Sequence, residues 1–136
     1  MLYYIESTYS EAKEYAKYNE KNYEVDDYGV RFELDINSVT ANCFLEDDND
    51  EKIRLNWGES YYVIKEDYTF ETNYEEARND FELVYSFLLE NFGEPDYVSE
   101  NDVGKMYYYS WWLDEDKDIS LVFMENRMAS IQIKVR

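Results

Sequence analysis

The clearest hydrophobic pattern along the chain alternates between apolar and polar residues. Between Tyr28 and Ile36 every second residue is apolar, and charged residues fill most of the positions between them. A period of two is typical of a strand with one buried face. Related patterns predict further strands at 39–45, 53–57, 61–64, 106–113, 119–124 and 127–135. The link Glu125-Asn126 is short enough for a tight hairpin, so neighbouring strands are expected to be antiparallel.

A helical period appears first after Thr8. Thr8 and Glu11 form a capping box, in which a hydroxyl and a carboxylate three residues apart satisfy free backbone N–H groups. Small and aromatic residues then recur on one face. A short helix is predicted here, ending near Lys21.

The second helical segment is longer and more apolar. Thr72 and Glu75 are predicted to form its capping box, and the apolar stripe that follows has helical spacing. Gly93 stands where a left-handed cap is needed, and Pro95 follows where a helix cannot continue. This helix is predicted over about 73–92.

These elements predict a single α+β domain over residues 1–136. Their order is one short helix, three or four strands, one long helix and three strands, with antiparallel meanders packed against the helices. The two halves are similar in outline, since each has a capped helix followed by an antiparallel meander. Either an internal duplication or the common way in which such units begin and end explains the similarity. The segment 81–135 is similar in outline to the repeat units of BamE-like and β-lactamase-inhibitor-like domains. That resemblance is one of topology, and it implies no function.

Charge changes the picture more than any motif does. The chain has 32 acidic and 13 basic residues and no histidine, which gives a net charge of −19. Direct binding to nucleic acid or to an anionic membrane is disfavoured, because both require cationic groups. A basic protein surface is a suitable partner, since complementary potentials speed encounter and fix orientation. Solubility alone is the other explanation of the acidity.

Cysteine and hydropathy bear on location. Cys43 is the single cysteine, so a reducing compartment is the simplest inference. The first residues lack the basic and apolar regions of a signal peptide, and no apolar stretch is long enough to span a membrane. We therefore expect a cytoplasmic protein.

The sequence offers little to a catalytic mechanism. Without histidine, Ser-His-Asp and Cys-His arrangements are impossible. Cys43 shares the apolar face of a predicted strand, where a buried thiol is inert. Glycine-rich phosphate loops and zinc ligand sets are absent from the sequence. We predict no enzyme activity, no cofactor and no metal.

One acidic segment resembles a calcium loop by spacing alone. Asp114, Asp116 and Asp118 stand at positions one, three and five, and Glu125 stands at position twelve. Ile119 occupies the position that requires glycine. Residues 119–124 also alternate as a strand, which would carry Glu125 away from the aspartates. A solvated hairpin turn is predicted instead.

Acidic residues gather in two predicted turns and on the outer face of the long helix. If these three segments converge, they form a negative patch that matches a basic groove or imitates a nucleic-acid backbone. The candidate residues are Asp47, Asp48, Asp50 and Glu51 in the first turn, Glu75, Glu76, Asp80 and Glu82 on the helix, and Asp114, Glu115, Asp116 and Asp118 in the second turn.

Aromatic residues fill both faces of the predicted strand 106–113. We select Tyr107, Tyr109 and Trp111 as candidate partner-binding aromatics, because Tyr and Trp are favoured anchors at interfaces. A role in the core is the alternative for the same residues.

The sequence therefore favours a non-enzymatic acidic protein that inhibits or neutralises a basic, nucleic-acid-handling protein. The expected partner is a nuclease, a toxin or a nucleic-acid-guided effector, and the chain resembles phage inhibitors and toxin-immunity proteins in size and acidity only. Two alternatives stay open. One is a homo-oligomeric scaffold domain, such as a homodimer, that uses its aromatic strands as an interface. The other is a carbohydrate-binding domain.

Overall fold

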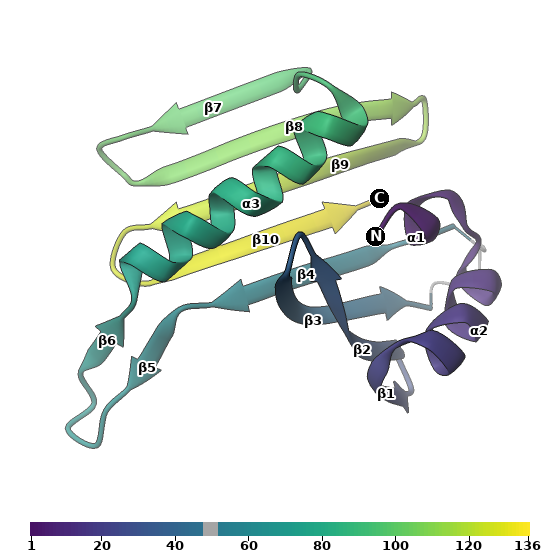
Figure 1. Ribbon diagram of the computed structural model, residues 1–136, viewed down its shortest axis with the longest axis horizontal. Helices are drawn as coiled ribbons and strands as arrows, with labels where there is room; N and C mark the ends of the chain where they lie inside the picture. Colours follow the sequence, from purple (N-terminus) through teal and green to yellow (C-terminus); the bar gives the residue numbers. More distant parts are fainter. Residues whose placement is uncertain (48–51) are drawn as a thin grey trace.

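The computed structural model describes residues 1–47 and 52–136, which form a sheet-rich α+β fold (Figure 1). Eight strands make one antiparallel sheet in the order β1-β2-β3-β4-β10-β9-β8-β7. The first half of the chain contains α1 (Leu2–Glu6), α2 (Tyr9–Asn19), β1 (Lys21–Asp26), β2 (Gly29–Ile36), β3 (Val39–Glu46) and β4 (Leu55–Ser60). The second half contains a separate hairpin of β5 (Tyr62–Ile64) and β6 (Phe70–Thr72), then α3 (Tyr74–Phe92), β7 (Tyr97–Asn101), β8 (Met106–Asp114), β9 (Lys117–Glu125) and β10 (Ala129–Val135).

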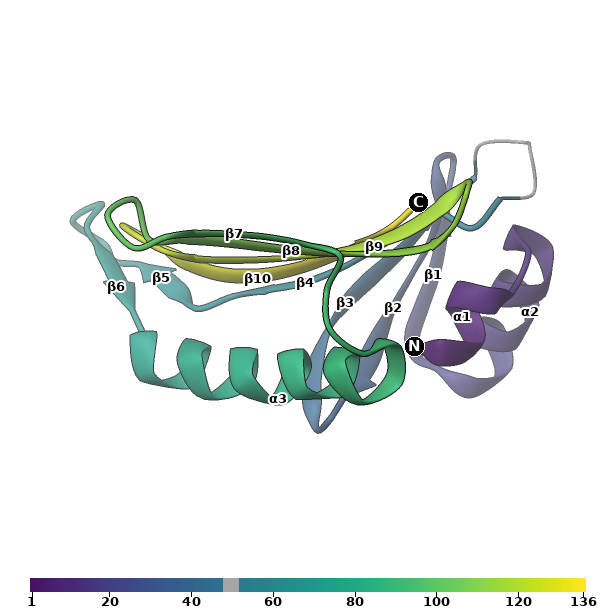
Figure 2. The same ribbon diagram turned by 90° about the horizontal axis from the view of Figure 1, so that it is seen from above.

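All three helices lie on the same face of the sheet. The α3 helix crosses strands β8 to β10, and α1 with α2 lies against the β1–β3 end, where the sheet has twisted strongly (Figure 2). The pairing register places Phe32, Cys43 and Trp57 on this covered face, in line with Ile133 and Leu121. All five are buried. The opposite face carries no helix, and we call it the open face.

Polar atoms of the large core side chains have partners on the covered side. Trp57 Nε1 donates to the Leu34 carbonyl at 2.9 Å, and Trp111 Nε1 donates to the Gly93 carbonyl at 2.9 Å. Unpaired polar groups are costly in a dry interior, so these bonds make the aromatic core possible. The second bond also ties the end of α3 to β8.

The helix starts follow local capping chemistry. Thr8 Oγ1 accepts from the Glu11 N–H at 3.3 Å, as the first capping box predicts. In α3 the cap is Asn73 rather than the predicted Thr72. Asn73 Oδ1 accepts from the Glu76 N–H at 3.1 Å and its Nδ2 donates to Glu76 Oε2 at 3.0 Å, so the predicted box is shifted by one residue.

The predicted α+β class and antiparallel strands are confirmed, whereas the predicted element order is incomplete. The structure adds the short helix α1 and the strands β1, β6 and β7. In β1 only Tyr23 is half-buried, and every residue of β7 is exposed. Such edge strands lack the alternation that reveals a strand in a sequence. The hypothesis of two duplicated halves stays a prediction. Within the described residues, no helix is long and apolar enough to cross a membrane.

Candidate binding face

The open face is built from the strand residues that point away from the helices. Three rows of side chains cross its central strands, as the pairing register defines. The rows are Asn101, Met106, Met124, Ser130 and Ser60; Ser99, Tyr108, Val122, Gln132, Gly58 and Asn42; and Tyr97, Ser110, Ser120, Lys134, Asn56 and Phe44.

Charge is depleted in these rows. Lys134 is their only charged residue, although 33% of the residues in the chain are charged. Serine, asparagine, tyrosine and methionine predominate instead. Depletion of charge is typical of the centre of a protein interface. Tyrosine, serine and asparagine are also the residues that antibodies favour for contacts.

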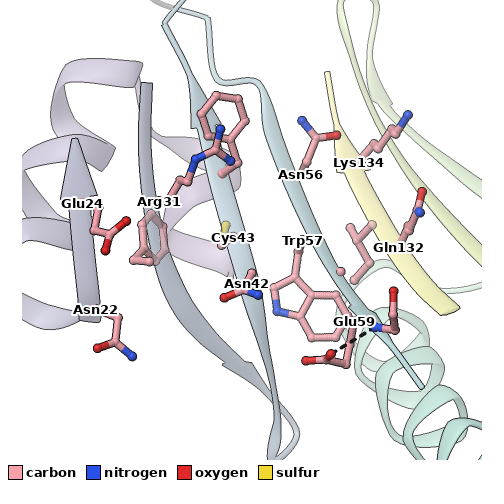
Figure 3. Close-up of a pocket in the computed structure, with 15 residues that line it drawn as sticks. Asn22, Glu24, Arg31, Asn42, Cys43, Asn56, Trp57, Glu59, Gln132 and Lys134 are labelled. Carbon is pink, nitrogen blue, oxygen red and sulfur yellow. Dashed lines mark hydrogen bonds between the residues drawn. The ribbon is translucent and has the colours of Figure 1, made fainter. Parts of the chain in front are cut away.

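One half of the open face is hollowed. The hollow has a volume of about 670 Å³ and is bordered by residues of β1, β2, β3, β4 and β10 (Figure 3). Gly58 lies in its floor, between Asn42 and Gln132. A Cβ atom at Gly58 would meet the Ile131 carbonyl oxygen at 3.0 Å and Gln132 Cγ at 3.5 Å. The absence of a side chain at this position therefore keeps the hollow open.

The walls of this hollow offer free hydrogen-bonding groups. Asn42, Asn56 and Gln132 project from three adjacent strands (Figure 3), and none makes a side-chain hydrogen bond within the described residues. Each carboxamide carries two donor hydrogens and an acceptor oxygen. Arg31 is already engaged, because its Nε bonds Asp26 Oδ2 at 3.1 Å and its guanidinium lies 4.2 Å from the Phe44 ring centroid.

The other half of the open face, on β7 and β8, is aromatic. Trp112 is 63% exposed, Tyr97 is 52% exposed and Met106 is 46% exposed. Tyr108 lies beside Tyr97, with ring centroids 5.9 Å apart, and its hydroxyl is 3.0 Å from Ser120 Oγ. Exposed aromatic rings on a rigid sheet can serve as anchors for a partner.

The aromatics selected from the sequence belong to the opposite face. Tyr109 and Trp111 are 5% and 1% exposed, and the half-buried Tyr107 packs against the same core. The α3 helix covers them, with the Tyr85 ring 4.6 Å from that of Tyr109. The prediction of these residues as partner-binding aromatics is therefore corrected. Because strand 106–113 is aromatic on both faces, its sequence gave no way to tell which face a helix covers.

The described residues on either side of the first predicted acidic turn lie at the same end of the sheet as the second turn. Val135 pairs with both Leu55 and Ile119, which places the β3–β4 connection beside the β8–β9 turn. Residues of both segments border a single hollow of about 300 Å³, next to the C-terminal Arg136. The β1–β2 turn, with Asp26 and Asp27, belongs to the same end. We call this region the acidic end.

The structure places the predicted turn residues as follows. Asp47, Asp114, Glu115 and Asp116 are exposed, and Asp118 is half-buried. Asp114 Oδ1 accepts from the Asp116 N–H at 2.9 Å, as in the predicted hairpin turn. Asp48, Asp50 and Glu51 lie outside the described residues.

The acids of α3 do not join this end. The helix begins at the opposite end of the sheet, where the Tyr74 hydroxyl donates to the Asn126 carbonyl at 2.8 Å (Figure 1). Its 19 residues span about 28 Å, so Glu75 and Glu76 lie roughly that far from the turns. Asp80 accepts a hydrogen bond of 2.8 Å from the Tyr61 hydroxyl, whereas Glu82 is exposed.

The side chains that could act in catalysis or bind a metal have structural roles instead. Cys43 is 1% exposed, and burial raises the pKa of its thiol, which disfavours the reactive thiolate. Glu125 lies at the end of β9 and forms a bidentate pair with Arg78, far from the aspartates of the turn. Within residues 1–47 and 52–136, no three acidic or cysteine side chains are placed to hold a metal ion.

Comparison with known proteins adds one structural similarity. No protein family model matches the chain, and no curated protein matches it in sequence. Among solved structures, a DUF4309 family protein from Bacillus subtilis is similar over 96% of this chain and 80% of its own, at 12% identity and a TM-score of 0.41. A similarity at this level carries no functional argument.

Proposed function

We propose that the protein is a non-enzymatic binding protein whose acidic end engages a basic protein surface. The partner class is a nucleic-acid-handling protein, namely a nuclease, a toxin or a nucleic-acid-guided effector. The proposal places both proteins in the cytoplasm. Binding would cover the partner's cationic groove and so inhibit it.

The observation that carries this proposal is the cluster of carboxylates in the β8–β9 turn beside an exposed tryptophan. Trp112 borders a hollow of about 430 Å³ together with Asp114, Asp116 and Asp118. Carboxylates form charge-assisted hydrogen bonds with Lys and Arg, and an exposed indole face attracts the same cations. One of the two basic groups at this hollow is turned to another task, since Lys117 Nζ donates to the Ile5 carbonyl at 2.7 Å.

Charge at this end would act mainly on encounter and orientation. The −19 net charge steers a cationic partner from a distance, and this steering falls as salt screens it. Affinity should therefore fall steeply between low and high ionic strength. The acids at the start of α3 would contribute only through the long-range electrostatic field, because they lie at the opposite end of the sheet from the acidic end.

Two variants with the same charge change separate local contact from net charge. One carries Glu115→Lys and Asp116→Lys at the acidic end, and the other carries Glu75→Lys and Glu82→Lys on α3. Basic proteins captured from a bacterial lysate by the wild-type chain are titrated against both. The acidic-end variant should lose binding by about 100-fold or more, and the α3 variant by about tenfold or less. Equal losses, or binding that ignores salt, would refute the proposal.

A further inference from the structure

We infer that the open face of the sheet binds a second copy of this chain. The inference does not rest on the proposed function, because the two contacts depend on different physical forces, although Trp112 borders both surfaces. Three observations carry it: the charge of the open face, its division into an aromatic and a hollowed half, and its size.

Charge selects this face for self-association. Two copies that each carry −19 repel each other wherever acidic surfaces meet. Over β3, β4 and β7–β10 the three central rows contain one charged residue, Lys134, and no carboxylate. On β2 and β1 these rows continue into Arg31, Glu33 and Glu24. When two copies meet through these rows, no carboxylate in the rows of one copy faces a carboxylate in the rows of the other. The covered face is unavailable, since the helices already occupy it (Figure 2).

The two halves of the open face complement each other under two-fold symmetry. The aromatic half lies on β7 and β8 and the hollow lies on β1 to β4 and β10, with the strand pair β4–β10 at the centre of the sheet. A two-fold axis through this centre places the aromatic half of each copy over the hollow of the other. Such isologous contacts are the usual basis of homodimers. In this arrangement β7 and β8 of each copy lie over β1 and β2 of the other, at the outer border of its hollow. The free amides of Asn42, Asn56 and Gln132 would meet β9, β10 and β4 of the other copy.

The size of the face suits a stable dimer. Eight strands at about 4.8 Å give a width of about 38 Å, and five residues along a strand give a length of about 17 Å. The flat area is therefore about 650 Å² before the relief of the side chains is counted. A standard interface buries about 800 Å² on each partner.

Salt gives this contact a distinctive signature. Screening weakens the repulsion between two acidic copies, so the dimer should become more stable as salt rises. Binding of a basic partner at the acidic end changes in the opposite direction. The two contacts can therefore fail or succeed independently.

The test measures mass by light scattering over a range of protein and NaCl concentrations. The wild-type chain should form a dimer whose fraction increases with NaCl. Gln132→Glu adds a carboxylate near the proposed axis and should weaken the dimer by at least about tenfold. Ser86→Glu, on the exposed surface of α3, adds the same charge elsewhere and should change the dimer far less.

Tryptophan fluorescence supplies a second measurement. Trp57 and Trp111 are 1% exposed, so Trp112 is the tryptophan whose surroundings dimerisation would change, and its emission should shift to shorter wavelength. A chain that stays monomeric at every salt concentration overturns the inference. So does equal weakening by both glutamate variants, or a monomer whose hollow binds neutral oligosaccharides.

Discussion

The two faces of the sheet differ in how their polar groups are paired, although the same strands build both. On the covered face, polar atoms of the large side chains are paired, as in the bond from Trp57 Nε1 to the Leu34 carbonyl. On the open face, the amides of Asn42, Asn56 and Gln132 have no partner within the described chain. The covered face thus supplies stability, and the open face has groups left over for binding.

The charges of this very acidic chain are distributed mainly outside the centre of the sheet. They lie at the ends of the sheet, on the helices, in the β5–β6 hairpin and on β1 and β2, where water solvates most of them. The core is apolar, and Lys134 is the one charged residue of the three rows over β3, β4 and β7–β10. Electrostatic repulsion between the acidic side chains therefore acts mainly at the surface, and it disturbs the packing of the core little.

Thiol reactivity should show the largest contrast between the two faces. Cys43 and Asn42 are neighbours in β3 that point to opposite faces, one buried and one exposed. A thiol reagent should modify wild-type Cys43 only when the protein unfolds, because burial raises its pKa and blocks access. The Asn42→Cys variant should react at its new thiol at least about 1,000-fold faster, given ordinary folding stability. Similar rates at both positions would contradict the assignment of the faces.

The second contrast concerns two tryptophans. Trp57→Ala should reduce the free energy of unfolding by about 3–5 kcal/mol, because it empties a fully buried site. Trp112→Ala should change it by less than about 0.5 kcal/mol, since the indole is 63% exposed. Urea unfolding of the two variants measures both values. A large loss in Trp112→Ala would show that the open face is part of the folding core.

The sequence predicted the strands that bury one face and missed those that bury none. Residues 29–36 alternate cleanly and lie where the pattern predicts, whereas β1 and β7 are edge strands with almost no buried residue. The cap of α3 is one residue later than predicted. Asn73 caps the helix by accepting from the Glu76 N–H, whereas Thr72 was predicted as the cap. Local sequence patterns thus predicted which helices and strands with a buried face exist more reliably than they predicted where each one begins and ends.

The candidate site could be predicted only in part. The acidity of both turns was visible in the sequence, but the position of β4 beside β10 depends on the pairing of strands far apart in the chain. The sequence favoured Tyr109 and Trp111 over Trp112, whereas the structure buries the first two and exposes the third, because alternation gives two faces without saying which one a helix covers. Charge depletion across the rows was hidden, since each row collects residues from up to six strands.

A third contrast compares two arginine pairs. Arg78 neutralises Glu125, whose side chain is 5% exposed, so Arg78→Met leaves a buried carboxylate without its partner and should lower the free energy of unfolding. Arg31 pairs with Asp26 at the solvent-exposed side, where both side chains are more than a third exposed. Arg31→Met should lower the free energy of unfolding less, because water solvates the carboxylate that remains. Thermal or urea unfolding distinguishes the two, and equal costs would contradict the difference in burial.

The smallest predicted effect appears at alkaline pH. Burial, and then hydrogen bonds to Glu20, Asp80 and Glu100, raise the pKa of Tyr4, Tyr61 and Tyr109 above that of free tyrosine. The unfolded chain therefore loses these protons first, so the contribution of these three tyrosines to stability is complete below about pH 10 and falls above it.

Unfolding midpoints measured from pH 8 to 12 check this direction, and Tyr61→Phe should make the decline shallower. Stability that rises above pH 10 would contradict the pairing of these hydroxyls on the covered side.

Hydroxyl-radical footprinting tests most directly the central claim about the two faces, that the open face is the surface through which two copies of the chain associate. Tyr97, Met106 and Trp112 are exposed on this face, and Tyr18 and Tyr68 are 73% and 87% exposed elsewhere. As protein concentration increases at high salt, oxidation of the first three should fall while oxidation of Tyr18 and Tyr68 stays constant. Unchanged oxidation of Tyr97, Met106 and Trp112, or equal protection of Tyr18 and Tyr68, would contradict the account.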